Sequence, residues 1–288
     1  MERELWKIIS RQVTAVDRHF TKGQYTHSIG RVVRVYLWAV LHDRPVYWAC
    51  RRENWPGVRP PNVLPDQSRM SRRLRQKDTQ AFLDELTQRL FERPECDLVK
   101  MLDGKPLTVA RHSQDADATY GYGAGGMCRG YKLHAIYGKS STPLAWKVHP
   151  INIAESMVAR DLIKELTDEG YLLADKNYDR NPLYDLAHTH GHQFVAPRHK
   201  PKTGLGHRHH SPQRVRAIAL LEGPGTFGRK LFVKRRGIES RFGHLSSFGG
   251  GLTCLPAWVR SLPRVRLYVH AKLLIRAARD IIIRQGAA

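Results

Sequence analysis

Three carboxylates in this sequence stand where they could hold divalent cations. Asp103 and Asp175 each end an apolar run that predicts a strand, and Glu239 lies in a segment that can form a helix. The second acid follows the first by 72 positions (175−103), and the third follows the second by 64 (239−175). Hard cations such as Mg²⁺ prefer carboxylate oxygens, and two of them about 3.5–4 Å apart can activate the attacking oxygen and stabilise the leaving oxygen. The three acids therefore predict metal-dependent phosphoryl transfer.

Asp103 and Glu239 each also have a simpler interpretation. Asp103 precedes Gly104, and an Asp-Gly pair is typical of a tight turn. Glu239 could be a surface residue of a helix that pairs with Arg235 four positions earlier, which would contribute about 0.2–0.5 kcal/mol. Neither residue identifies a site when it is taken alone.

Asp175 has a simpler interpretation and a rival. It could be an acid at the end of a strand that pairs with Lys176 or Arg180. Asp179 could take the second metal-binding position in its place. Asp175 fits that position better because it directly follows the apolar residues 171–174.

The charge of the chain indicates an acidic partner. It has 48 Lys+Arg against 26 Asp+Glu, a formal net charge of +22. Residues 1–97 carry 18 bases and 12 acids, whereas residues 198–276 carry 17 bases and only two acids. Nucleic acid is the first candidate, because a protein that neutralises phosphates releases their counterions. An anionic membrane surface is a weaker candidate, since no long amphipathic basic helix stands out.

The composition also argues against several classes of protein. No run of 18 apolar residues predicts a membrane span, and the N-terminus lacks the apolar core of a signal peptide. We therefore expect a cytoplasmic protein. The four cysteines are too far apart for a CxxC metal site or a disulfide framework, which fits a reducing compartment: Cys50, Cys96, Cys128 and Cys254.

Residues 1–95 are predicted to form a helical DNA-binding region. Apolar residues recur there at helical spacing, and prolines between 45 and 65 punctuate the chain. Ser68 or Ser71 could cap one helix, and Asp78 could open the next. Short helices with a basic cluster suggest a helix-turn-helix-like unit, with an ordinary helical bundle as the alternative: Arg69, Arg72, Arg73 and Arg75. Residues 93–95 are a plausible domain boundary.

Residues 96–288 are predicted to form an α/β domain with a mixed sheet. Strand-like segments broken at Gly104 are followed by a glycine-rich loop over residues 111–130. A last helix, residues 265–283, is expected to pack against the sheet. The remaining expected elements are strands at 131–137, 143–148, 171–175 and 193–196, a helix at 153–166 with Met157 inward, a helix from 181, and a helical stretch at 231–245.

A basic insertion at about 198–228 interrupts this pattern. Its first part is rich in histidine, and four of these residues could ligate zinc: His199, His207, His209 and His210. They lack cysteine partners and regular spacing, so we expect a disordered or DNA-contacting linker instead.

Taken together, these residues resemble the transposases of bacterial insertion sequences, which carry an Asp-Asp-Glu triad on a ribonuclease H-like fold. The resemblance covers residues 67 to 274, most of the chain. Its most specific motif includes Ala174-Asp-Lys and the following Tyr178-Asp179. The motifs that carry the resemblance are Ser71-Arg-Arg-Leu-Arg75, Leu102-Asp103-Gly104, Gly130-Tyr-Lys-Leu-His134, Leu173-Ala-Asp-Lys-Asn-Tyr-Asp179 and Arg236-Gly-Ile-Glu-Ser-Arg-Phe-Gly243.

The resemblance implies an activity, a cofactor and partners. Asp103, Asp175 and Glu239 would hold two Mg²⁺ or Mn²⁺ ions. Water would attack at the end of the element, and the freed 3′-hydroxyl would then attack target DNA. The partners would be terminal inverted repeats and target DNA, bound by a homo-oligomer, expected to be a dimer in the DNA complex, in the nucleoid-associated cytoplasm.

The resemblance also assigns contacts with DNA. Many relatives place Tyr, Arg, Glu and Lys around the last acid, and in this chain those positions hold Phe232, Arg235, Glu239 and Ser246. Only the arginine and the glutamate match, so a phosphate contact carries over to Arg235. The other expected DNA contacts are Lys132, His134, Lys176, Arg236 and Arg241, of which Lys132 and His134 could shape the site instead.

Two other functions remain open from the sequence. A nuclease or resolvase of the same fold would use the same chemistry without joining the cut ends to target DNA. A catalytically inactive DNA-binding regulator derived from a transposase would keep the basic surface without the reaction.

Overall fold

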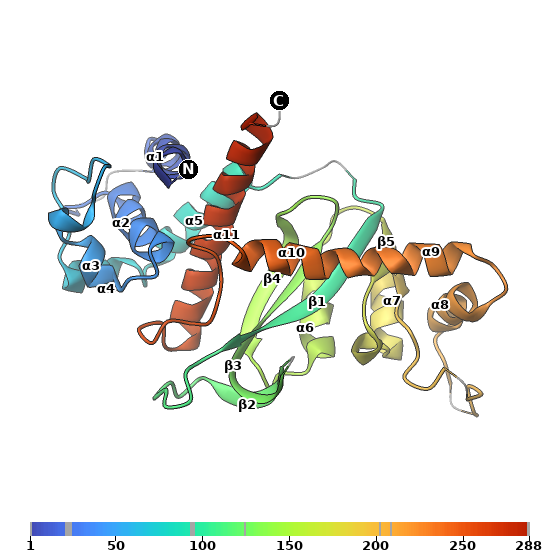
Figure 1. The fold of residues 1–288 in the computed structure, drawn as a ribbon. Coiled ribbons are helices and arrows are strands. Elements are labelled where there is room, and N and C mark those ends of the chain that lie inside the picture. The colour runs from blue at the N-terminus through green and yellow to red at the C-terminus, as the bar shows by residue number, and fades with distance from the viewer. Residues whose placement is uncertain are drawn as a thin grey trace. The chain divides into compact units, whose positions relative to one another are not determined.

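The computed structural model describes residues 2–20, 25–92, 96–123, 125–201, 203–207 and 209–286. The chain divides into two compact units (Figure 1). We refer to Met1–Glu92, Leu245–Val259 and Pro263–Ala288 as the helical unit, and to Arg93–His244 with Arg260–Leu262 as the sheet unit. The expected boundary at residues 93–95 lies outside the described residues. No described helix is long and apolar enough to cross a membrane.

The helical unit is built from amphipathic helices with polar caps. Ser28 caps α2 by accepting from the Arg31 amide, and Asp66 caps α4 by accepting from the Arg69 amide. Asp66, and neither expected serine, therefore caps α4. The elements are α1 (Glu2–Asp17), α2 (Ile29–Leu41), α3 (Val46–Ala49), η1 (Arg52–Asn54), α4 (Gln67–Arg73), α5 (Lys77–Leu90) and α11 (Leu262–Gly286).

Helix α11 packs with the N-terminal helices. The Lys272 ammonium is fully buried and donates to the carbonyl of Val40 over 2.9 Å and to Asp43 over 2.6 Å. The expectation that this helix packs against the sheet was wrong, because apolar periodicity reveals a buried face and says nothing of the partner. The division into residues 1–95 and 96–288 stays a prediction, and the helical unit also includes Leu245–Val259 and Pro263–Ala288.

The sheet unit has the α/β fold with a mixed sheet that the sequence predicts. Its strands follow the order β2-β3-β1-β5-β6, and β4 pairs with β3. Strands β1, β5 and β6 are parallel, whereas β3 runs antiparallel to β1, β2 and β4. The strands are β1 (Val99–Thr108), β2 (Thr119–Gly123), β3 (Gly126–Tyr137), β4 (Pro143–Pro150), β5 (Gly170–Leu173) and β6 (His192–Val195).

Two glycine-based expectations about this sheet were wrong. Gly104 does not break β1, which is continuous from Val99 to Thr108. Much of the expected glycine-rich loop is an antiparallel hairpin of β2 with the start of β3. Gly130 has a φ of 155°, and a Cβ there would lie 2.2 Å from the Leu107 carbonyl oxygen. This glycine therefore permits a close approach of two strands.

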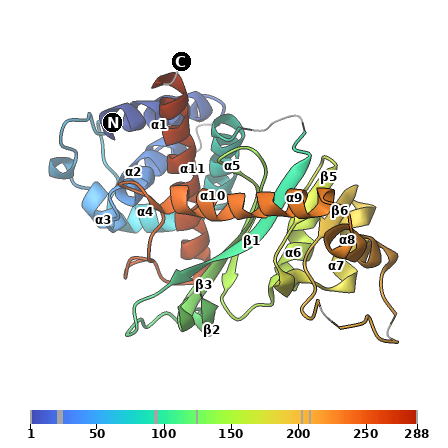
Figure 2. The ribbon, with the colours of Figure 1, turned by 45° about the vertical axis from the view of Figure 1, so that its right-hand side comes forward.

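Helices cover both faces of the sheet (Figures 1 and 2). On one face, α6 (Glu155–Ile163) and α7 (Asn181–Thr189) pack on a core that includes Leu102, Leu172 and Phe194. On the other, α9 (Phe227–Val233) packs on Leu173 and Val195, and η3 (Lys234–Arg236) with α10 (Gly237–Ser246) follows it. Helix α8 (Pro212–Glu222) packs beside β6. Met157, expected inward on α6, is instead 64% exposed.

Candidate active site

The first two predicted acids lie where strands β1 and β5 separate. Strand β5 pairs with β1 only at Val99 to Met101 and ends at Leu173. Asp103 stands two residues beyond the last residue of β1 that pairs with β5, and Asp175 stands two residues beyond the end of β5. Both acids therefore follow the paired parts of adjacent parallel strands, and that edge of an α/β sheet is a common place for a site.

Asp103 sits in a largely buried and strongly charged setting. Its side chain is 20% exposed, and its Oδ2 atom accepts from Arg235 over 2.7 Å. Burial raises the pKa of Asp103 to about 6, opposed by the Gly104 amide and by Arg235 and reinforced by the charges of Asp175 and Glu155. Asp103 and Asp175 are thus close enough to repel one another, as two acids of one cation site would be.

Asp175 is held by the turn that follows β5. It caps the short 3₁₀ helix η2 (Lys176–Tyr178) and accepts from the amide and the side chain of Asn177 over 2.9 and 3.2 Å. The rival acid Asp179 has a different environment, since Arg214 donates to both of its oxygens over 2.6 and 2.7 Å. Asp179 therefore anchors α8, whereas Asp175 keeps partial exposure beside the strand end.

Arg235 connects the third predicted acid to the first. Glu239 lies in the first turn of α10, its side chain is 67% exposed, and its Oε1 atom is 3.5 Å from Nη1 of Arg235. Residue 237, where the chain approaches β1, is a glycine, and a Cβ there would lie 3.0 Å from the sulfur of Met101. One guanidinium thus pairs with Asp103 and Glu239 together.

Two residues that the sequence analysis did not assign to the site lie among these acids. Glu155, the first residue of α6, accepts from the Lys132 ammonium over 2.7 Å. Tyr178 is fully buried, and the charges that act on its hydroxyl are those of Glu155, Asp103, Asp175 and Arg235. Only the place of Glu155 at the start of a helix could have pointed to it, since no spacing in the sequence relates it to the other acids.

The structure gives Lys132 and His134 internal positions. Lys132 is 9% exposed and bonded to Glu155, so it faces the acids. His134 is fully buried, and neither ring nitrogen has a partner among the residues the structure describes. Burial, then the charges of Lys132 and His149, lowers the pKa of His134 to about 3. The expected DNA contact of His134 stays a prediction, and in this conformation its ring does not reach the surface.

The other predicted DNA contacts of this unit differ in exposure. Lys176 and Arg236 are exposed. Arg241 is half-buried, and one of its guanidinium nitrogens donates to the carbonyl of Lys139. Lys176 and Arg236 are therefore the more accessible cations, and Arg241 is partly committed to the fold.

The arginines of the cluster in the helical unit also differ in exposure. Arg69, Arg72 and Arg75 are exposed. Arg73 is 8% exposed, pairs with Asp78 over 3.1 Å and lies over the ring of Tyr25, 3.7 Å from its centroid. The expected DNA contact of Arg73 stays a prediction, and in this conformation its guanidinium pairs with Asp78 and lies over Tyr25.

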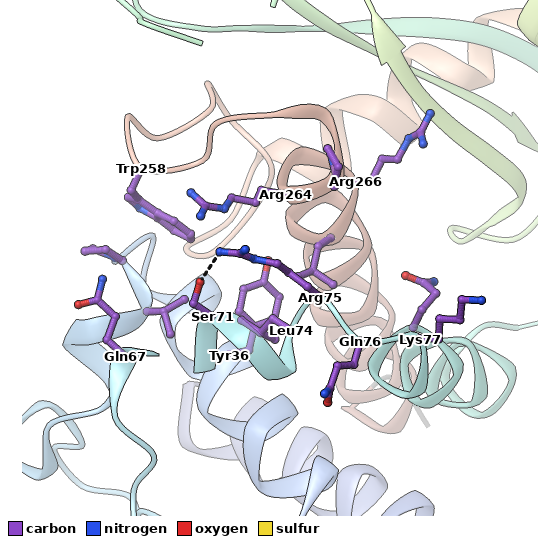
Figure 3. A pocket seen from close by; sticks show the side chains of 15 residues that line it. Tyr36, Gln67, Ser71, Leu74, Arg75, Gln76, Lys77, Trp258, Arg264 and Arg266 are labelled. Atoms are coloured by element: carbon purple, nitrogen blue, oxygen red, sulfur yellow. Dashed lines mark hydrogen bonds between the residues drawn. The ribbon is translucent and has the colours of Figure 1, made fainter. Parts of the chain in front are cut away.

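A pocket of about 650 Å³ opens beside this cluster (Figure 3). Its lining includes Tyr36 and Trp258 together with Arg75, Arg264 and Arg266. Arg75 donates to the Ser71 hydroxyl over 2.9 Å at its edge. The start of α11 thus adds two arginines to the basic side of the helical unit.

The donor chemistry of the sheet-unit site fits a hard cation. Asp103, Asp175 and Glu239 offer carboxylate oxygens, which Mg²⁺ and Mn²⁺ prefer. In this conformation, no group of three or more Asp, Glu, His or Cys side chains among the described residues is placed to hold a metal ion. The same holds for the described part of the His-rich segment. The guanidinium of Arg235 pairs with two of the three acids, so a cation has to exchange places with it.

A comparison with protein families shows to which family the chain belongs. A profile of the transposase DDE domain matches residues 94–275, which are 182 of the 288 residues. The chain belongs to the transposase DDE domain family. The matched segment of this transposase includes Asp103, Asp175 and Glu239 and ends within α11. No curated protein and no solved structure matches the chain significantly.

Proposed function

We propose that this transposase cuts DNA at the ends of an insertion sequence in a metal-dependent reaction and transfers the cut strands into target DNA. One observation supports the proposal most directly. The acids that the sequence separates by many positions gather in one unit, with Asp103 and Asp175 acting on each other and Arg235 joining Asp103 to Glu239. Family membership supports the same reaction class.

The three acids have one shared role in this proposal. Asp103, Asp175 and Glu239 hold two Mg²⁺ or Mn²⁺ ions, which supply an activated attacking oxygen and a stabilised leaving oxygen. Strand β1 and the capped turn after β5 fix the first two acids, whereas Glu239 is free to move because its side chain is 67% exposed. Exposure lets Glu239 adjust when DNA enters.

Basic side chains bind the DNA in two places. In the sheet unit, Arg235, Arg236 and Lys176 contact phosphates near the reacting bond, with Arg241 close by. In the helical unit, the exposed arginines of α4 and its following turn contact DNA flanking that bond: Arg69, Arg72 and Arg75. These contacts hold the backbone by charge, and they use part of the basic excess that gives the chain its net charge of +22.

In this proposal, two consecutive parts of the chain have different functions. Residues 1–95 supply DNA binding, and residues 96–288 supply catalysis and carry the basic insertion at about 198–228. The transposase binds terminal inverted repeats and target DNA as a homo-oligomer, a dimer in the DNA complex, in the nucleoid-associated cytoplasm.

An assay on DNA that carries the terminal repeats tests this function. Wild-type protein with Mg²⁺ is expected to cut at the repeat ends and to join them to a second DNA, and Asp103→Asn is expected to do neither. Asp161→Asn, which changes an exposed acid of α6, serves as the control and should remain active. Cutting without joining would identify a nuclease or resolvase, and binding without cutting would identify an inactive regulator.

A further inference from the structure

A buried hydroxyl among the acids lacks a hydrogen-bond partner. The Tyr178 side chain is fully buried, and its hydroxyl has no partner among the residues the structure describes. An unsatisfied buried polar group destabilises the fold, so a further acceptor or donor is expected there. The charge that acts on this hydroxyl most strongly is that of Glu155, followed by Asp103 and Asp175.

Glu155 approaches Asp103 from the sheet face that carries α6. Its partner Lys132 lies along β3, where a Cβ on Gly104 would be 2.7 Å from the Lys132 Cδ atom. The Lys132 stem therefore covers the residue next to Asp103, and its ammonium reaches Glu155 over 2.7 Å. Strand β5 ends at Leu173, so no strand covers the β5 side of β1 at Asp103. The charge of Glu155 acts on Asp103 there.

Two side-chain cations thus neutralise the acids from opposite faces of the sheet. Arg235 pairs with Asp103 from the face covered by α9, and Lys132 pairs with Glu155 from the face covered by α6. Both pairs are largely buried, with exposed fractions between 11% and 20% for the four side chains. Burying charges is costly unless they are paired. A cation that binds between these acids would therefore compete with Arg235 and Lys132 for them.

We propose that Glu155 is a fourth carboxylate of the cation site, and that it binds one of the two divalent ions once Lys132 releases it. This proposal rests on the proposed function and deepens it. Two divalent ions bring four positive charges against three acids, so a fourth carboxylate balances the site. The Tyr178 hydroxyl then donates to a carboxylate or to a water on the ion.

Measurement of Mn²⁺ binding tests this role without using catalysis. Free Mn²⁺ is followed by electron paramagnetic resonance as it titrates the full chain, and thermal unfolding checks each variant. Glu155→Gln is expected to weaken Mn²⁺ binding by about 10-fold or more. Glu165→Gln is the matched control, because Glu165 also accepts from a strand lysine, Lys147, over 2.7 Å outside the site. Its Mn²⁺ affinity should equal that of the wild type.

A purely structural role for the pair makes a different prediction. If Glu155 served only to satisfy Lys132, then replacing both, in Lys132→Met with Glu155→Gln, would restore wild-type Mn²⁺ affinity. The proposal expects this double variant to bind as weakly as Glu155→Gln, and Lys132→Met alone to bind at least as tightly as the wild type. Should Glu155→Gln fail to fold, the double variant, which buries no unpaired charge, gives the same measurement.

Two results would overturn the role of Glu155. These are wild-type Mn²⁺ affinity in Glu155→Gln, or recovery of affinity in the double variant. Asp103→Asn separates this failure from failure of the proposed function. If Asp103→Asn weakens Mn²⁺ binding while Glu155→Gln does not, only the fourth carboxylate is refuted. If neither changes it, the cation site itself is refuted.

Discussion

Arg235 donates from Nη2 to the Oδ2 atom of Asp103 over 2.7 Å, although 132 residues separate the two in the chain. The same guanidinium lies 3.5 Å from Glu239. A guanidinium fork binds phosphates as readily as carboxylates, so a DNA phosphate at Arg235 would compete with both acids. In the proposed function, binding of DNA phosphate and release of the acids would therefore be linked at one side chain.

Arg235→Gln is expected to separate these two effects. Without DNA, the variant should bind Mn²⁺ several-fold more tightly, by about 3- to 10-fold, because no guanidinium competes for Asp103. Strand cleavage should nevertheless fall by about 100-fold, since the phosphate contact is lost. Mn²⁺ titration and cleavage assays check both, with Arg160→Gln, a change of an exposed arginine of α6, as control. Weaker Mn²⁺ binding in Arg235→Gln would contradict the competition.

Neutralising the acids should remove catalysis and spare DNA binding. Asp103→Asn, Asp175→Asn and Glu239→Gln are each expected to reduce Mg²⁺-dependent cleavage by at least about 100-fold, because the ions lose a charged ligand. Gel-shift affinity for terminal-repeat DNA should stay within a few-fold of the wild type. Full activity in any one variant would remove that residue from the site.

The helical-unit arginines should differ in their effect on the salt dependence of binding. Arg72→Gln and Arg75→Gln are expected to lower the slope of log affinity against log salt by about one each, as for lost phosphate contacts. Arg73→Gln should leave the slope unchanged and lower the melting temperature, since Arg73 pairs with Asp78 and Tyr25. DNA affinities over a salt series, together with thermal unfolding, distinguish the two groups. A slope unaffected by all three would place the DNA elsewhere.

His270 should make the helical unit sensitive to acid. Burial lowers the pKa of His270 from 6.5 to about 4, and its Nε2 atom lies 2.7 Å from the Thr87 hydroxyl. Between these two pH values the unfolded chain binds a proton that the folded chain does not, so stability falls as pH decreases. This loss is on the order of 3 kcal/mol. His270→Gln should remove this pH dependence. The difference in unfolding free energy between wild type and variant, measured with denaturant, should therefore become smaller from pH 7 to pH 4. A constant gap would contradict a neutral buried His270.

The Lys272 and Asp43 pair should hold α11 to the N-terminal helices. Lys272 is fully buried and also donates to the Gly250 carbonyl over 2.8 Å. Asp43→Ala leaves this ammonium buried without a carboxylate and should cost about 3–5 kcal/mol of unfolding free energy. Lys272→Met, which removes the charge instead, should cost less. The reverse order, measured by chemical denaturation, would show that the carbonyls alone satisfy Lys272.

The sequence alone determined most elements and the first two acids of the candidate site. Apolar periodicity located α1, α2, α6 and the later strands, because a 3.6- or 2-residue repeat is a local property. Asp103 and Asp175 could be chosen because each ends an apolar run. Local patterns failed at the glycines, since Gly104 and Gly130 serve contacts with neighbouring strands.

Tertiary structure decided which charges meet. It brought Arg235 onto Asp103, placed Glu155 and Tyr178 among the acids, and buried His134. It also packed α11 with the N-terminal helices. These outcomes depend on strand register and on the point where β5 ends, and residues far apart in the chain fix both together. A sequence specifies its charges one by one, whereas their pairing follows from long-range packing that no local pattern contains.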